Sequence, residues 1–281
     1  MVRASVVIPA HNEERGIGRT LEALYDGMAP DEFEVVVVCN GCTDRTADVV
    51  RAAFPQVRVL ELETPGKAGA VAAGNAVAST FPRLHLDADV RLPGRAIGTL
   101  IAALEADQRL LAVAPERDLD RTGCSRVVSW YYDVWEQLPQ VRTGLFGRGA
   151  FVLSAAGQSR VDGLPSVMSD DLVVSDAFAP EERAVVAHAR SEVVAARRVR
   201  DLVNRRVRIV TGGAQAAAAG VRRDDSVTRV STLLAVCARE PRLFLRLPVF
   251  LGVTIAARFR ARKMVRAGDF STWLRDDSSR A

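Results

Sequence analysis

The segment SVVIPAHNEE, residues 5–14, joins a short apolar run rich in β-branched residues to a cluster of polar side chains. An apolar run without alternating polar residues is typical of a strand that is buried on both faces. The same unit recurs three times, with the strand given first and its polar residues second: 33–38 with 40–44, 57–61 with 61–67, and 83–86 with 87–89. Each polar cluster therefore follows the end of a predicted strand.

Helical patterns separate these strands and cover residues 16–25, 44–53 and 68–78. Strands that alternate with helices predict an α/β fold, with a mostly parallel, Rossmann-type sheet flanked by helices. Ligands of such sheets bind beyond the carboxyl ends of the strands. We therefore expect the polar clusters to meet in one site.

Asp87 and Asp89 are separated by one residue, so an extended backbone directs both carboxylates to the same side. Two carboxylates at the end of a buried strand suit Mg2+ or Mn2+, which also bind waters and substrate phosphates. A solvated turn is the alternative interpretation of the same pair. The other clusters favour a nucleotide diphosphate, because Asn12 and Glu13 can hydrogen-bond a base or ribose and Lys67 can contact a phosphate or a base carbonyl.

The second half of the chain is less regular. We expect a helix over residues 95–110, an aromatic helix or loop over 125–137, and mostly helical structure over 190–220. The adjacent carboxylates of Asp170 and Asp171 repel one another, so one of them can bind a proton more readily and act as a general base. Alternatively, Asp170 caps a helix and Asp171 interacts with the helix dipole.

The composition limits the class of protein. The chain has 281 residues, 48% of them hydrophobic and 26% charged, which excludes a disordered chain and suits one or two domains. The excess of 38 basic over 34 acidic residues is mild, and we expect no nucleic-acid partner. Cys39 and Cys42 form C-x-x-C without a second cysteine or histidine pair, which disfavours a zinc site. With neither a signal-peptide pattern nor an uncharged apolar stretch of spanning length, a cytoplasmic protein is expected.

Five segments, in this order, resemble the motifs of family 2 glycosyltransferases with the GT-A fold: residues 6–14, 40–46, 66–70, 86–89 and 169–172. The resemblance extends over residues 4–215. It implies a hexosyltransferase that moves a sugar from a UDP- or GDP-sugar to an acceptor hydroxyl, with inversion and with Mn2+ or Mg2+. The acceptor would be a glycan, a lipid-linked molecule or a small molecule.

The resemblance also implies roles for individual residues. Asp87 and Asp89 would hold the metal, and Asp171, with Asp170 beside it, would be the catalytic base. Residues after the predicted strands would bind the nucleotide: Pro9, Asn12, Glu13, Asn40, Asp44, Lys67 and Asp87. These roles are expectations that rest on the matching positions.

Two departures from the family pattern matter. Cys39 or Asn40 stands where family members often have aspartate, so an amide would contact the nucleotide there. The Q-x-x-R-W motif of processive synthases is broken, with Arg205, Arg208 and Ile209 at its Gln, Arg and Trp positions. This favours an enzyme that adds one sugar. Arg208 would either add positive charge near the diphosphate or lie on an ordinary helix surface.

Two other functions remain open: a non-catalytic protein that binds nucleotide sugars, and a sugar-nucleotide pyrophosphorylase, which the acidic cluster after the first strand disfavours. We expect a catalytic domain over residues 1–220, with a nucleotide-binding half, 1–92, and an acceptor half, 93–220. A helical, basic appendage over 221–281 follows. Its apolar and basic residues either lie on the inner face of a membrane or pack on the catalytic domain.

Overall fold

The computed structural model describes residues 2–29, 31–165, 167–223 and 227–268. The chain forms two compact units, each made of segments that are separated in sequence. Unit 1 comprises Met1–Asp118, Arg148–Gly163 and Pro180–Val193, and unit 2 comprises Leu119–Gly147, Leu164–Ala179 and Val194–Ala281. This division follows packing, whereas the functional division at residues 92 and 220 stays a prediction.

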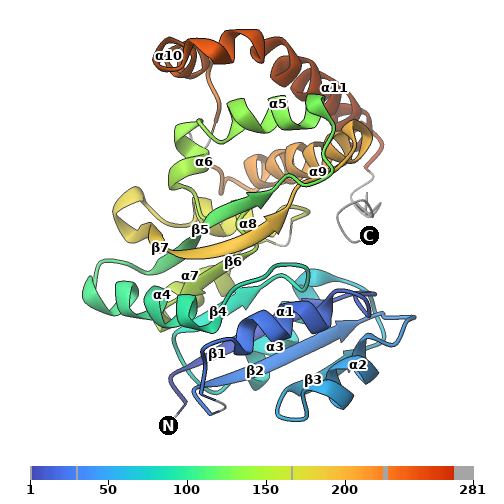
Figure 1. Cartoon of the computed structure of the whole chain (residues 1–281), viewed down its shortest axis with the longest axis vertical. Coiled ribbons are helices and arrows are strands. Elements are labelled where there is room, and N and C mark those ends of the chain that lie inside the picture. The colour runs from blue at the N-terminus through green and yellow to red at the C-terminus, as the bar shows by residue number, and fades with distance from the viewer. Residues whose placement is uncertain (1, 30, 166, 224–226, 269–281) are drawn as a thin grey trace. The chain divides into compact units, whose positions relative to one another are not determined.

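Unit 1 is built around a sheet of seven strands in the order β3-β2-β1-β4-β6-β5-β7 (Figure 1). β1 pairs in parallel with β2 and β4, β2 pairs in parallel with β3, and β6 runs antiparallel to β4 and β5. The strands are β1 (Ala4–Ala10), β2 (Phe33–Asn40), β3 (Arg58–Leu62), β4 (Arg83–Leu86), β5 (Ala112–Asp120), β6 (Ala150–Leu153) and β7 (Arg183–Val194). The predicted α/β fold with a mostly parallel sheet is confirmed.

Helices cover both faces of this sheet, which explains the continuous apolar strands. Val35 and Val37 of β2 face one core, and Val36 and Val38 face a second core that contains Ala70. Successive side chains of a strand point to opposite faces, so burial on both sides removes the usual alternation. The helices of unit 1 are α1 (Ile17–Tyr25), α2 (Thr46–Ala53), α3 (Lys67–Val77), α4 (Gly94–Ala106), α7 (Ala155–Asp162) and η1 (Pro180–Glu182).

Unit 2 is helical. Its elements are α5 (Arg126–Trp135), α6 (Pro139–Thr143), α8 (Asp170–Asp176), α9 (Val199–Ala218), α10 (Val230–Arg239), η3 (Pro241–Leu245) and α11 (Leu247–Arg266). α5 and α11 pack through Tyr131 and Phe250, whose rings stack with centroids 5.1 Å apart. Tyr131 is fully buried, whereas Trp130 beside it is 38% exposed. The aromatic segment is therefore a helix that directs most of its rings into a core. Among the described helices, none is both long and apolar enough to cross a membrane.

The region 190–220 is mostly helical, as predicted, since α9 runs from Val199 to Ala218, but its first residues belong to β7, which continues to Val194. Ala189 and Ser191 are buried while His188 and Arg190 are exposed, which is the period of two of a strand. The helix predicted over residues 95–110 ends at Ala106.

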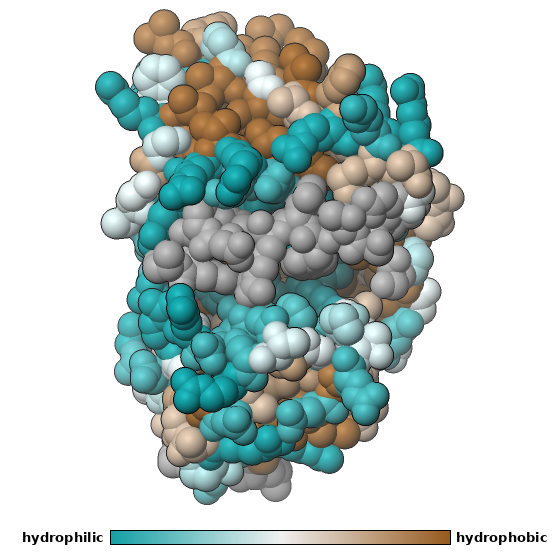
Figure 2. Space-filling model, turned by 90° about the vertical axis from the view of Figure 1, so that its right-hand side faces the viewer, coloured by the Kyte–Doolittle hydropathy of each residue, from teal (hydrophilic) through white to brown (hydrophobic). Residues whose placement is uncertain are grey.

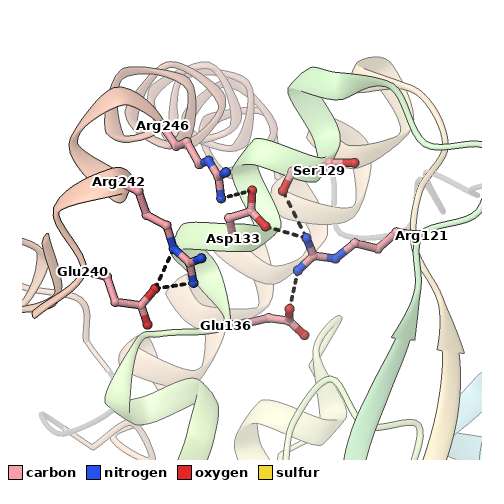
Figure 3. A network of polar contacts seen from close by, with 7 residues as sticks. All are labelled: Arg121, Ser129, Asp133, Glu136, Glu240, Arg242 and Arg246. Carbon is pink, nitrogen blue, oxygen red and sulfur yellow. Dashed lines mark hydrogen bonds and ion pairs between the residues drawn. The ribbon is translucent and has the colours of Figure 1, made fainter.

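A polar network joins three segments of unit 2 (Figure 3). Arg121 follows β5 and donates to Asp133 on α5 at 2.7 Å and to Glu136, one turn further on. Arg246, between η3 and α11, binds the other oxygen of Asp133 at 2.6 Å. Asp133 therefore links the C-terminal helices to the rest of unit 2.

Replacing Asp133 by alanine removes both of these ion pairs and leaves two arginines without their shared carboxylate. Since hydrogen bonds to charged groups contribute about 1.5–3 kcal/mol each when they are partly buried, we expect the free energy of unfolding to fall by about that amount. Chemical denaturation followed by circular dichroism measures this change. Asp107→Ala is the matched control, because its pair with Arg109 is exposed. An equal loss in both variants would contradict a special role for the network.

Candidate functional site

The loops that follow β1 and β2 hold one another at the carboxyl edge of the sheet. The Asn12 side-chain oxygen accepts the Thr43 N–H at 2.8 Å, and the Glu13 N–H donates to the Thr46 hydroxyl at 2.8 Å. Asn12 has a left-handed backbone, with φ of 53°. The residues predicted to bind a nucleotide after β1 therefore lie next to those after β2.

Asn40 connects three segments at this edge. Its side-chain amide donates to the Ala10 carbonyl at 2.8 Å, and its side-chain oxygen accepts the Gly66 N–H at 2.9 Å. Asn40 is buried. It therefore fixes the turn that leads to Lys67, the first residue of α3. Pro9, also predicted near the nucleotide, is a buried residue of β1.

Asp44 also bonds within the loops. Its two oxygens accept the N–H groups of Thr46 and Glu14, each at 3.0 Å. Partial burial would raise the pKa of Asp44, but the hydrogen bonds from Thr46 and Glu14 hold it below its ordinary value. Asp44 is therefore an ionised anchor for the start of α2.

Cys39 and Cys42 lie in the same region. Burial, together with the neighbouring Cys42, raises the pKa of the Cys39 thiol to about 12. At neutral pH this thiol is protonated, and metal binding requires a thiolate. The Cys42 sulfur accepts the Asn12 N–H at 3.4 Å, so it supports the nucleotide loop.

The Asp-x-Asp segment begins directly after β4. The Lys67 ammonium lies 2.8 Å from a carboxylate oxygen of Asp87. Asp87 is half-buried and Asp89 is exposed. The backbone between them is held by the Thr20 hydroxyl, which donates to the Ala88 carbonyl at 2.8 Å. Lys67, predicted to contact the nucleotide, thus lies beside a residue predicted to hold the metal.

The donor set suits a particular class of ion. Within the described residues, no group of three or more His, Cys, Asp or Glu side chains could enclose a metal ion. Asp87 and Asp89 offer two carboxylates, and Mg2+ or Mn2+ commonly takes one or two, completing its shell with waters and substrate phosphates. These residues therefore fit an ion that arrives with, or is completed by, a diphosphate.

Gly149 shapes this turn through its backbone. Its carbonyl accepts the Asp87 N–H at 2.8 Å, and its φ is 65°. A Cβ at this position would lie 2.2 Å from a methyl carbon of Val90. Only glycine can therefore bring this carbonyl to Asp87 without displacing the segment that carries both carboxylates.

We expect Gly149→Ala to lower stability by about 1–3 kcal/mol, because a non-glycine residue is strained at this φ. The displaced turn should also weaken any stabilisation by Mn2+ plus nucleotide. Thermal unfolding with and without these ligands measures both effects. Gly163→Ala is the control, since Gly163 has a negative φ and open space where the Cβ would be added. Unchanged ligand stabilisation in Gly149→Ala would contradict this role.

In unit 2, Asp170 and Asp171 occupy the first turn of α8. The helix begins at Asp170, so Ser169, not Asp170, is in the N-cap position. One oxygen of Asp171 accepts the Gly147 N–H at 2.8 Å, and the other lies 3.3 Å from the Ser169 hydroxyl. The carboxylate thereby fixes the end of the glycine-rich segment 144–147, whose Leu145 N–H donates to Ser175 at 3.0 Å.

α9 packs against the segment that leads into α8. The Met168 N–H donates to the Gln215 side chain at 3.0 Å. A Cβ on Gly212 would lie 2.6 Å from the Ser169 backbone nitrogen, so the two backbones touch. Arg208, predicted to bind diphosphate, is a half-buried residue of α9.

Sequence reasoning assigned no role in positioning the acids to the residues that have it: Gly147, Gly149, Gly212 and Gln215. A glycine pair inside a helix, such as Gly212 and Gly213, is the one available signal, because it weakens the helix unless close packing requires it. The other contacts join backbone groups to distant segments and leave no local pattern.

The comparisons with known proteins agree with this geometry. The model of the family described as Glycosyl transferase family 2 matches residues 5–147. The probable glycosyltransferase YdaM of Bacillus subtilis (strain 168) is 32% identical over 119 residues, 40% of this chain and 28% of that protein. The 4,4'-diaponeurosporenoate glycosyltransferase of Staphylococcus aureus (strain USA300) is 35% identical over 118 residues, 40% of this chain and 31% of that protein. The aligned segments therefore span less than a third of these relatives.

Solved structures resemble the whole chain. Mannosyltransferase PcManGT from Pyrobaculum calidifontis, in complex with GDP-Man and Mn2+, has a TM-score of 0.63 and 21% identity, covering 95% of this chain and 79% of that chain. S. aureus TarS 1-349, in complex with UDP, has a TM-score of 0.55 and 15% identity, covering 96% and 93%. These likenesses show the GT-A fold that the sequence resemblance implied. Since the family model matches half of the chain, the chain belongs to glycosyl transferase family 2.

Proposed function

We propose that this glycosyltransferase moves a hexose from a UDP- or GDP-sugar to an acceptor hydroxyl, with inversion at the anomeric carbon and with Mn2+ or Mg2+. The observation that carries the proposal is the placement of Lys67 and Asp87, 2.8 Å apart, next to Asp89 at the end of β4. A cation beside two carboxylates suits a diphosphate and the divalent ion that accompanies it.

Both the donor and the metal receive support from the fold neighbours. PcManGT is in complex with GDP-Man and Mn2+, and TarS is in complex with UDP or UDP-GlcNAc. Here Asn12, Glu13, Asn40 and Asp44 would frame the nucleotide, either directly or through the loops that they hold together.

The divalent ion, when bound, supplies Lewis-acid stabilisation of the departing diphosphate. Asp87 and Asp89 would hold it, and Lys67 would add positive charge to the same group. Asp171 would accept the proton of the acceptor hydroxyl as that oxygen attacks the anomeric carbon. Its carboxylate is oriented by two backbone groups, because the Gly147 N–H donates to one oxygen and the Leu172 N–H donates to the other, each at 2.8 Å. Arg208 would contribute charge toward the diphosphate.

The acceptor would be a glycan, a lipid-linked molecule or a small molecule, and the broken Q-x-x-R-W motif supports a single addition. A location at the inner face of a membrane, through the basic C-terminal helices, is a separate proposal that does not depend on this activity.

Thermal unfolding in the presence of UDP, GDP and other nucleoside diphosphates, each with Mn2+, Mg2+ or EDTA, tests the donor site first. A ligand at 100 times its Kd stabilises the folded state by about 2.7 kcal/mol, a shift of several degrees for a chain of this size. We expect one nucleotide to shift the midpoint only when the metal is present. No shift with any nucleotide would contradict the proposal.

A further inference from the structure

The last described segment of unit 2 exposes apolar side chains that a folded chain usually buries. Of the fourteen large apolar side chains that are exposed in the described residues, nine lie between residues 227 and 268, so the exposure is concentrated there. Seven of them form what we term the apolar surface: Val230 and Leu234 on α10, Phe244 and Leu245 on η3, and Leu251, Ile255 and Phe259 on α11. Figure 2 shows apolar residues gathered at the upper end of the molecule, where Figure 1 draws these helices.

α11 is apolar on two opposite faces. Phe250, Val253 and Ala257 are buried against the rest of unit 2. Leu251, Ile255 and Phe259 follow one another at intervals of four residues, so they share a single stripe. Ile255 is 63% exposed and Phe259 is 69% exposed. The buried face accounts for folding, and the exposed stripe has no structural use in the described chain.

The charge around this surface is strongly one-sided. Residues 227–268 contain nine arginines and lysines but only one acidic residue, Glu240. Five exposed basic residues occupy the last turns of α11, directly after Phe259 or beside it: Arg258, Arg260, Arg262, Lys263 and Arg266. Two copies of this face would repel one another, whereas an anionic surface would attract it.

The surface is held firmly on unit 2. Arg246, at the start of α11, binds Asp133 at 2.6 Å (Figure 3). Phe250 of the same helix stacks on Tyr131 of α5. The exposed side chains are therefore displayed on packed helices. Exposed apolar side chains bordered by lysine and arginine are typical of helices that lie in the interface of an anionic bilayer.

We propose that α10, η3 and α11 form a docking surface for an anionic lipid membrane. Val230, Leu234, Leu245, Ile255 and Phe259 enter the acyl boundary, and the basic residues at the end of α11 bind the lipid head groups. This inference does not depend on the sugar-transfer activity, because it rests on unit 2 alone.

Sedimentation with vesicles tests the proposal. We expect the chain to bind vesicles of phosphatidylcholine with 30% phosphatidylglycerol, and to bind pure phosphatidylcholine vesicles at least about tenfold more weakly. Ile255→Ser with Phe259→Ser should lower the partition coefficient at least about tenfold, since both side chains lose apolar burial. Arg258→Gln, Arg262→Gln, Lys263→Gln and Arg266→Gln together should lower it about as much, and 0.5 M salt should mimic them.

Val2→Ser with Phe81→Ser is the matched control for the apolar pair, because each of these side chains is 39% exposed and lies in unit 1. Circular dichroism with thermal unfolding checks that the variants fold. The proposal is overturned if the chain does not prefer anionic vesicles, or if Ile255→Ser with Phe259→Ser binds as the wild type does. It is also overturned if light scattering shows a dimer that this double variant dissociates and no vesicle binding occurs, since the surface would then join two copies.

Discussion

Replacing Asp171 by asparagine should lower the turnover of sugar transfer by about 10²–10⁴-fold, the usual contribution of a general base. Donor affinity should stay unchanged, because the proposed role of Asp171 is toward the acceptor hydroxyl. Asparagine keeps the shape of the side chain and one oxygen, so the hydrogen bond from the Gly147 N–H can persist. The measurements are single-turnover rates with the stabilising nucleotide sugar, and nucleotide affinity by calorimetry.

Asp170→Asn is the matched control, since Asp170 lies in the same helical turn and is also half-buried. It should lose less activity than Asp171→Asn. A larger loss of turnover in Asp170→Asn than in Asp171→Asn would show that Asp170 is the base. If neither variant loses turnover, the chain uses another base. If the wild type binds the nucleotide sugar but transfers no sugar, the chain is a binding protein.

Asp89→Asn should produce the second large effect, a fall in transfer rate of about 10²–10³-fold, comparable to removal of one electrostatic contact to the developing charge. Asp89 is exposed, whereas Asp87 is also paired with Lys67, so Asp89 tests the metal role more cleanly. The metal-dependent part of the nucleotide stabilisation should disappear, while the stability of the free protein stays the same. Thermal unfolding with nucleotide and Mn2+ or EDTA separates these quantities.

Asp31→Asn provides the control for this experiment. Asp31 is an exposed aspartate in the turn before β2, at the opposite end of that strand from Asn40. It should leave both the metal-dependent stabilisation and the transfer rate unchanged. If the metal-dependent stabilisation survives in Asp89→Asn, and also in Asp87→Asn, the ion is held elsewhere.

The first half of the fold was predictable because its signals are local. Val6, Val7 and Ile8 form an apolar run without alternation, and the structure buries this run between the parallel strands β2 and β4. Helices α1 to α3 begin within a few residues of where the pattern predicts them. β7 was not predicted, and its last residues, from Arg190 to Val194, were included in a stretch predicted to be mostly helical.

The candidate site, like the fold, has features that the sequence predicts and features that only the folded chain shows. The sequence by itself determined which polar residues follow β1, β2 and β4, and the parallel sheet brings them to one edge because all three strands run in the same direction. The tertiary structure alone decided what each side chain contacts: Asn40 supports the Gly66 turn, and Lys67 pairs with Asp87.

Hydrophobic periodicity is a property of neighbouring residues, so it can be read along the chain. The hydrogen bonds between Gly149 and Asp87 and between Gly147 and Asp171 join backbone groups to segments far away in sequence. Every glycine has the same backbone groups, so the sequence does not distinguish these two glycines from the others. Only the folded chain could therefore show which glycines hold the acids.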